Sequence, residues 1–169
     1  MKKITFLFFM ASIIFSCQKS KQIPFEKHGV KFTCPTGWKI EDEEANEEYF
    51  SVVMQKDGLT SSGTIIVTCI YDSLDNSKMM YKLQSSFKHN TMYKDLDIKF
   101  DSIVTDTFNF MPCIKSSFKF DWWGDIDQGY YSVLHGTHKT VCILFQEAAK
   151  HSDNNKNDFI KFERSFSVN

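Results

Sequence analysis

The chain has 169 residues, of which 42% are hydrophobic, 24% charged and 15% aromatic, with a formal net charge of -1 and a mean hydropathy of -0.31. This length fits one globular domain and excludes a large multidomain enzyme. The polarity excludes a protein with several membrane-spanning helices, and 17 phenylalanines exclude a disordered chain.

The N-terminus carries a targeting pattern. Lys2-Lys3 precede an uncharged, largely apolar run over residues 4–15, which is too short to span a bilayer, and a small residue then precedes Cys17. The run Ile14-Phe15-Ser16-Cys17 resembles the lipobox of bacterial lipoproteins, in which the cysteine is acylated and the signal is removed before it. Phe15 is larger than the residue usual there. The alternative is an ordinary secretory signal, which Ile14 fits poorly because that peptidase prefers a small residue at this place.

We therefore predict a signal peptide over residues 1–16, a lipidated Cys17 within a short tether over 17–24, and one globular domain over 25–169. The resemblance implies a membrane-anchored protein of the bacterial cell envelope that faces the periplasm or the exterior. The 20 basic side chains include only one arginine, Arg164, and the lysines are scattered. Neither nucleic acid nor anionic lipid headgroups are expected as partners, because both are recognised by clustered Lys and Arg.

Four cysteines follow Cys17, namely Cys34, Cys69, Cys113 and Cys142. An oxidising compartment permits two disulfides among them, with three possible connectivities. Each cysteine lies in an apolar or strand-like stretch and no C-x-x-C motif occurs, which favours buried thiols.

The first half of the domain predicts strands and one helix. Residues 30–34, 38–40 and 49–55 read as extended segments, and the acidic stretch Glu41 to Glu48 reads as a solvated loop or helical turn. Residues 64–71 are apolar on both faces, which is typical of a central strand. Met79, Met80, Leu83 and Phe87 then recur at helical spacing up to about Met92, with Asp75 or Ser77 as the cap.

The second half predicts a strand meander and a last helix. Over residues 113–122 apolar and polar side chains alternate, and turns at Gly124-Asp125 and Gly136-Thr137 separate this strand from those over 130–135 and 140–145. Ser152 or Asp153 caps a final helix on which Phe159, Phe162 and Phe166 share one face. The fold class is therefore α+β, an antiparallel sheet with helices packed on its faces.

Two signatures resemble the PsbP-like fold, which photosystem-II extrinsic proteins share with bacterial DcrB-like envelope proteins. One is the early segment Phe32-Thr33-Cys34-Pro35-Thr36-Gly37-Trp38, and the other is the closing segment Phe162-Glu163-Arg164-Ser165-Phe166. The resemblance covers about residues 25–168 and implies an α/β/α sandwich. It implies no catalytic residue, and it favours binding or scaffolding over chemistry.

Motifs for metal or covalent chemistry are weak. His135 and His138 stand near one turn without a third ligand, and Asp121, Asp125 and Asp127 lack the spacing of a calcium loop, so no metal and no cofactor is expected. Cys142 lies four residues from His138, but a strand that is apolar on both sides argues for a buried thiol without nucleophilic activity.

The candidate interaction surface surrounds Trp123. If Trp122 points into the core, Trp123 should lie on the other face near a hairpin end, rimmed by Asp121 and Asp125, with Tyr130 or Tyr131 opposite it. A helix covering Trp123 is the alternative, because this fold buries both sheet faces. Exposed aromatic clusters are common contact surfaces.

These observations favour a lipid-anchored, non-enzymatic module that binds another protein or assists assembly at the membrane. The first alternative is a carrier or sensor of a small ligand, with a pocket between sheet and helix. The third option is a hydrolase, which would require an exposed Cys142 or a histidine with a carboxylate partner.

Overall fold

The computed structural model describes residues 22–56, 58 and 62–169. The predicted signal peptide, Cys17 and residues 17–21 of the predicted tether lie outside the described residues. The elements are β1 (Ile23–Lys27), β2 (Val30–Cys34), β3 (Lys39–Ala45), β4 (Tyr49–Lys56), β5 (Gly63–Ile70), α1 (Asn76–His89), β6 (Lys99–Phe100), β7 (Val104–Phe108), β8 (Met111–Trp122), β9 (Asp125–Gly136), β10 (Lys139–Ala148), a 3-10 turn over Ala149–His151, α2 (Ser152–Ser165) and β11 (Ser167–Val168).

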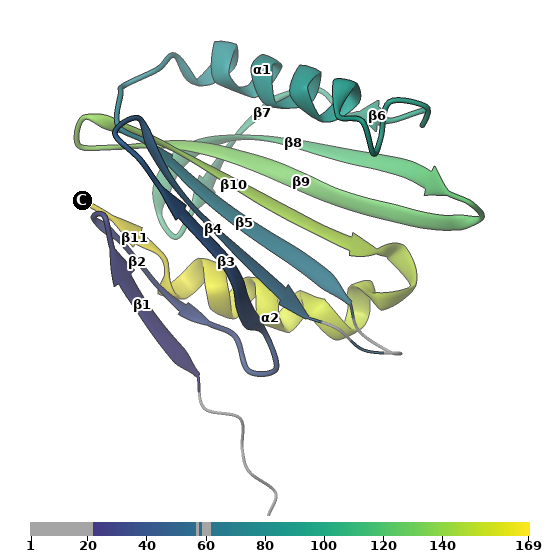
Figure 1. Cartoon of the computed structure of the whole chain (residues 1–169), viewed down its shortest axis with the longest axis horizontal. Coiled ribbons are helices and arrows are strands. Elements are labelled where there is room, and N and C mark those ends of the chain that lie inside the picture. Colours follow the sequence, from purple (N-terminus) through teal and green to yellow (C-terminus); the bar gives the residue numbers. More distant parts are fainter. Residues whose placement is uncertain (1–21, 57, 59–61) are drawn as a thin grey trace, which may run out of the picture.

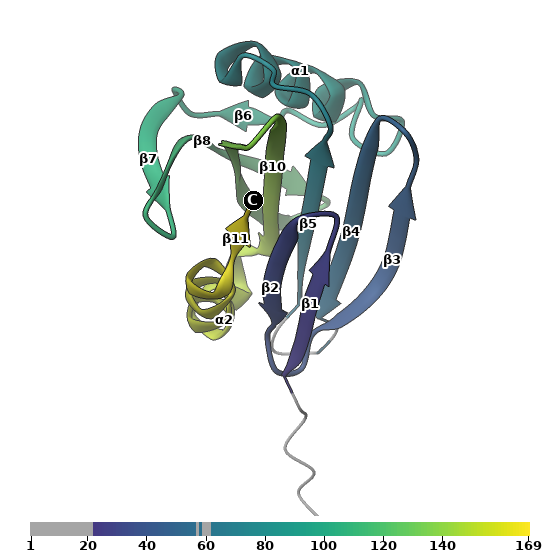
Figure 2. The same ribbon diagram turned by 90° about the vertical axis from the view of Figure 1, so that its left-hand side faces the viewer.

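The main sheet is antiparallel and has eight strands. Its order is β3-β4-β5-β10-β9-β8-β6, and β7 pairs with β8 beside β6. Figures 1 and 2 show α1 over one face of this sheet, with α2 and a small sheet of order β1-β2-β11 on the other. The predicted antiparallel sheet with helices on its faces is confirmed.

The α1 face is closed by aromatic and aliphatic packing. Met80 and Phe87 of α1 are buried against alternate residues of β8, including Phe118 and Phe120, as the period of two predicted. The helix begins at the predicted cap, because Asp75 accepts a hydrogen bond from the Lys78 amide at 2.8 Å. It ends at His89, three residues before the predicted end at Met92.

The α2 face contains the larger core. Phe162 and Phe166 are fully buried and contact Phe32 of the small sheet, with ring centroids 5.1 and 6.5 Å apart. Trp38 is 3% exposed, and it follows Gly37, whose φ of 85° requires a residue without Cβ strain. The two signature segments therefore pack against each other as structural elements.

A buried polar network fixes the position of α2. The Lys56 ammonium contacts the Asp158 carboxylate at 2.7 Å, and the Trp38 indole N–H donates to the same oxygen at 3.1 Å. The Lys56 ammonium also donates to the Asn155 side-chain oxygen at 3.3 Å, while the Asn155 side-chain amide donates to the Ser62 carbonyl at 2.7 Å. Both side chains of the ion pair are more than four-fifths buried, so the pair is nearly desolvated.

Three predicted boundaries need correction. The acidic residues from Glu41 to Glu44 belong to the exposed edge strand β3, where charged side chains protect a sheet edge from further pairing. Strand β1 begins at Ile23, inside the segment predicted as tether, because it pairs with β2. Helix α2 begins after His151, which caps it without a side-chain hydrogen bond, so neither Ser152 nor Asp153 is the cap.

No helix in the described part of the chain is long and apolar enough to cross a membrane.

Candidate functional site

The turn between β8 and β9 has an unusual backbone. Trp122 pairs with Asp125, which leaves Trp123 and Gly124 as a two-residue loop. Both have positive φ, 49° and 93°, as a type I′ turn requires. Gly124 fits this conformation, whereas a tryptophan is rare in it, because its Cβ approaches the backbone.

The Trp123 side chain is 90% exposed. Its ring contacts Trp122 at a centroid distance of 5.5 Å, and Trp122 packs in turn against Tyr93 of the loop after α1, at 5.6 Å. The exposed indole therefore stands at the end of a row of rings that leads into the α1-side core. This hairpin projects beyond the neighbouring strands at one end of the molecule (Figure 1).

Two carboxylates hold the turn. The Gly124 amide donates to the Asp121 carboxylate at 2.6 Å, and Asp125 forms an ion pair with Lys150 at 2.8 Å. Ile126 adds apolar surface and is 45% exposed. We call residues 121–126 the hairpin tip: a projection with exposed apolar side chains, whose turn is fixed by the Asp121 carboxylate.

The structure corrects the predicted place of two tyrosines. Tyr130 pairs with Ser117 and Tyr131 with Ser116, well inside the hairpin and away from the tip. Tyr131 packs in the α1-side core, whereas Tyr130 packs against Phe145 in the α2-side core. The prediction failed because β9 begins at Asp125 rather than at Tyr130, so the turn lies further from both tyrosines.

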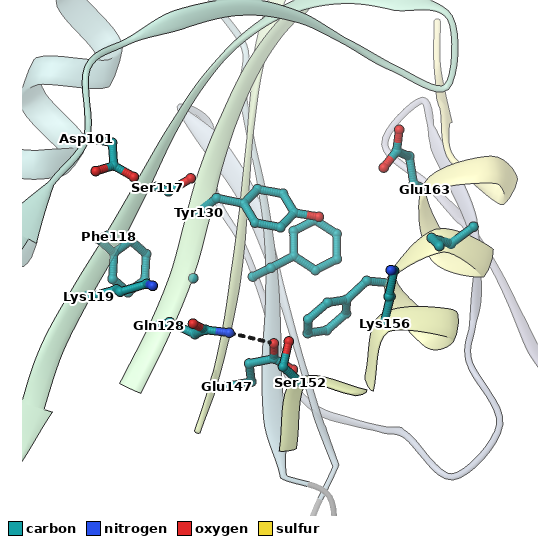
Figure 3. Close-up of a pocket in the computed structure, with 14 residues that line it drawn as sticks. Asp101, Ser117, Phe118, Lys119, Gln128, Tyr130, Glu147, Ser152, Lys156 and Glu163 are labelled. Carbon is teal, nitrogen blue, oxygen red and sulfur yellow. Dashed lines mark hydrogen bonds between the residues drawn. The ribbon is translucent and has the colours of Figure 1, made fainter. Parts of the chain in front are cut away.

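A second candidate site is a cleft between the main sheet and α2, with a volume of about 480 Å³. We call it the α2 cleft. Figure 3 shows Tyr130 on the sheet side facing Lys156 and Glu163 of α2, with Gln128, Glu147 and Ser152 grouped at one end. Its lining residues are Asp101, Ser117, Phe118, Lys119, Gln128, Gly129, Tyr130, Phe145, Glu147, Ser152, Lys156, Phe159, Ile160 and Glu163.

A pocket between sheet and helix belonged to the alternative interpretation of the sequence, a carrier or sensor of a small ligand, which named none of the lining residues. The one available signal was Glu147, an acidic side chain that follows the apolar run of β10 and is 7% exposed. Burial raises the pKa of Tyr130 well above its usual range, and the negative charges of Glu163 and Glu147 raise it further. The Tyr130 phenol therefore stays neutral in the α2 cleft.

A groove of about 450 Å³ lies on the other face of the sheet, beside α1. Its walls are mainly apolar and include Val53, Ile66, Leu83 and Leu144. Met80 of α1 does not line this groove, because its side chain is fully buried in the core.

The residues that were weak candidates for a metal site or a nucleophile have surroundings that fit neither role. Asp127 accepts a hydrogen bond from the Gln146 side chain at 3.1 Å, and His135 and His138 are both exposed at the β9–β10 turn. Within residues 22–56, 58 and 62–169, no group of three or more metal-ligating side chains occurs. Cys142 is 4% exposed, and burial raises the pKa of its thiol to about 12, so it is not an activated nucleophile.

All four described cysteines are buried thiols, as predicted. Burial raises the pKa values of Cys34 and Cys113 to about 11. The unfolded chain ionises its thiols at a pKa of about 8.5, so the free energy of unfolding should be unaffected by these groups below that pH and should fall as the pH rises from about 8.5 toward 11.

Two measurements test this prediction. Chemical unfolding between pH 8 and pH 10 should show the decline in stability, and thiol-labelling reagents should modify the native protein only at the rate of its unfolding. Rapid labelling of any of the four thiols in the native protein at about pH 8 would contradict it.

Known proteins match this chain in fold but not in sequence. No protein-family model matches it, and no curated protein matches it in sequence. Solved structures do match in fold. The cyanobacterial PsbP protein (CyanoP) of Synechocystis sp. PCC 6803 superposes with a TM-score of 0.63 at 14% identity, covering 91% of this chain and 96% of that one.

Two further structures are similar. LpqN of Mycobacterium tuberculosis, described as involved in cell envelope biogenesis, has a TM-score of 0.53 at 11% identity, covering 88% of this chain and 90% of that one. The protein PA94 of Pseudomonas aeruginosa, described as of unknown function, has a TM-score of 0.54 at 6% identity, covering 88% and 97%. At these identities the similarity shows the fold alone, and the chain has the PsbP-like fold that its signature segments predicted.

Proposed function

We propose that this protein is a non-enzymatic, lipid-anchored module of the bacterial cell envelope that binds another protein through the hairpin tip. The observation that carries the proposal is Trp123, a tryptophan that is 90% exposed on a turn where its own backbone conformation is unfavourable. Tryptophan is among the residues most enriched at the energetic centres of protein interfaces, and strained backbone residues cluster at functional sites.

The hairpin tip suits a protein partner better than a small ligand. It is convex and offers the Trp123 indole and the Ile126 side chain, which a groove on a partner could bury. The Asp121 carboxylate accepts a hydrogen bond from the Gly124 amide, so the turn is held in place before binding. A turn that is already ordered lowers the entropic cost of binding.

The envelope location rests on the predicted signal and on the fold comparison. If Cys17 carries two or three acyl chains, anchoring is firm, because each buried methylene contributes about 0.8 kcal/mol. Strand β1 begins at Ile23, six residues after Cys17, and six residues span at most about 20 Å. The domain would then act close to its membrane, which is compatible with the envelope role described for LpqN.

Photocrosslinking in living cells tests the binding half of the proposal. A crosslinking amino acid at Trp123 should give a discrete protein adduct. The matched control is the same amino acid at Phe110, which is 95% exposed at the β7–β8 turn and also has positive φ. The absence of an adduct at Trp123 in a folded, membrane-located variant, or equal adducts at both positions, would contradict it.

Replacement of the tip residue tests the same point by affinity. Trp123→Asn should weaken binding of the captured partner at least about thirtyfold, the loss typical of a central interface residue. It should also stabilise the fold by about 1 kcal/mol, because Asn-Gly fits the turn and tryptophan does not. Phe110→Gly creates the same Asn-Gly dipeptide at the β7–β8 turn and should stabilise the protein without weakening binding.

Cys17→Ala tests the anchor, and the protein should then leave the membrane fraction.

A further inference from the structure

The α2 cleft is lined by Glu147, a buried carboxylate that is incompletely hydrogen-bonded. Glu147 is 7% exposed. One of its oxygens accepts a long hydrogen bond of 3.4 Å from the Gln128 side-chain amide. The other, Oε2, has no hydrogen-bond partner in the described part of the chain, and Glu147 takes part in none of the ion pairs found there. A buried carboxylate in this state is costly unless a cation or donor reaches it.

The space beside this carboxylate is large enough for a small molecule. A volume of about 480 Å³ lies in the range of about 300–1,000 Å³ that is usual for ligand sites. Tyr130 of the sheet and Phe159 and Ile160 of α2 line this space, and the buried Phe145 of β10 lies behind them. A ligand there would have an apolar body between these side chains and a polar group toward Glu147.

The charges in the α2 cleft differ in depth. Lys119 and Lys156 are exposed, so their ammonium groups keep most of their hydration, whereas Glu147 is buried. Electrostatic interactions are stronger at the buried group because the local dielectric constant is lower. A cationic ligand therefore gains more at Glu147 than an anionic ligand gains at the two lysines.

We infer that the α2 cleft binds a small primary amine with an aliphatic or aromatic body, whose ammonium group donates to Glu147 and whose body packs against Phe159 and Ile160. This site shares no residue with the hairpin tip, so it is a second binding function and stands independently of the first. The ammonium would supply the counter-charge that Glu147 lacks among the described ion pairs, and the Glu147 side chain must turn for Oε2 to face it, because that atom is itself buried.

Three probes of equal chain length separate the head group from the body. Hexylammonium, hexanol and hexanoate are titrated against the full-length protein at pH 7, with affinity measured by calorimetry and the site located by amide chemical shifts. Hexylammonium should bind at least about tenfold more tightly than either of the others, the ratio expected for a hydrogen bond to a buried charged group, and its shifts should lie along β9, β10 and α2. Equal affinities, or tighter binding of hexanoate, would overturn the inference.

Substitutions test the assigned contacts. Glu147→Gln should abolish the preference for hexylammonium over hexanol and raise the melting temperature of the unliganded protein, because it removes an uncompensated buried charge. Glu47→Gln is the matched control on an exposed turn and should change neither. Ile160→Ala should weaken all three probes by the same factor. Trp123→Asn should leave hexylammonium binding unchanged, so that failure here and failure of the hairpin tip are distinguishable. An unchanged preference in Glu147→Gln would overturn the inference.

Discussion

Asp158→Ala should destabilise the protein by about 3–5 kcal/mol, the cost of leaving one buried charge without its partner. The variant removes the acceptor of both the Lys56 ammonium, at 2.7 Å, and the Trp38 indole N–H, at 3.1 Å. Lys56 would keep only its longer hydrogen bond of 3.3 Å to Asn155. Chemical unfolding at pH 7, followed by tryptophan fluorescence, measures the change in the free energy of unfolding.

Two controls show that this loss comes from burial of the ion pair. Lys27 and Glu43 are also 2.7 Å apart, but their side chains are 53% and 32% exposed, so Glu43→Ala should cost less than about 1 kcal/mol. Replacing both buried partners, as Lys56→Met with Asp158→Leu, should recover much of the loss, because no charge is then buried alone. A loss below about 1 kcal/mol in Asp158→Ala would show that the pair behaves as a surface pair.

The same network explains why the α2 cleft could not be predicted residue by residue. Its shape depends on where α2 lies over the sheet, and the contacts that fix α2 join residues far apart in sequence, such as Lys56 with Asp158 and Ser62 with Asn155. The start of α2 also depends on a residue that is distant in sequence. The Nδ1 atom of His151 contacts the amide and hydroxyl of Ser62, and local capping preferences contain no information on such a partner.

Sequence patterns predicted the features that depend on neighbouring residues, such as strand alternation and helix capping. The alternation along β8 predicted one shared, buried face for Phe118 and Phe120, and the structure packs this face under α1. Asp75 caps α1 as predicted. The pattern of apolar residues did not predict the acidic strand β3. An edge strand buries few side chains, and β3 is defined by its backbone pairing with β4. The sequence also indicated Trp123, because alternation with Trp122 near a hairpin end favoured an exposed ring. It misplaced Tyr130 and Tyr131 because the length of the hairpin is not encoded by alternation alone.

Gly129→Ala should be at least as damaging as Asp158→Ala, with a loss of more than about 3 kcal/mol and a decrease in melting temperature of about 6–12 °C. Gly129 of β9 pairs with Phe118 on one side and Gln146 on the other. A Cβ atom here would lie 2.7 Å from the Phe118 ring and 3.0 Å from the Gln146 Cα, and it would collide with the Phe145 carbonyl oxygen. The backbone of β10 cannot withdraw without breaking its pairing with β9, so the strain cannot be relieved by a side-chain rotation alone.

Two further variants distinguish a backbone collision from an ordinary cavity or strain effect. Gly37→Ala places a Cβ where no atom beyond the adjacent residues lies within 4 Å but where φ is 85°. It should therefore cost only about 1–2 kcal/mol, the penalty for a residue other than glycine in the left-handed conformation. Phe118→Leu added to Gly129→Ala relieves the ring contact but not the contacts with β10, so it should recover little of the loss. Calorimetric melting of the three variants tests this order. Full recovery in the double variant would show that only the ring resists the new methyl group, and β10 would then be able to move away from β9 at this position.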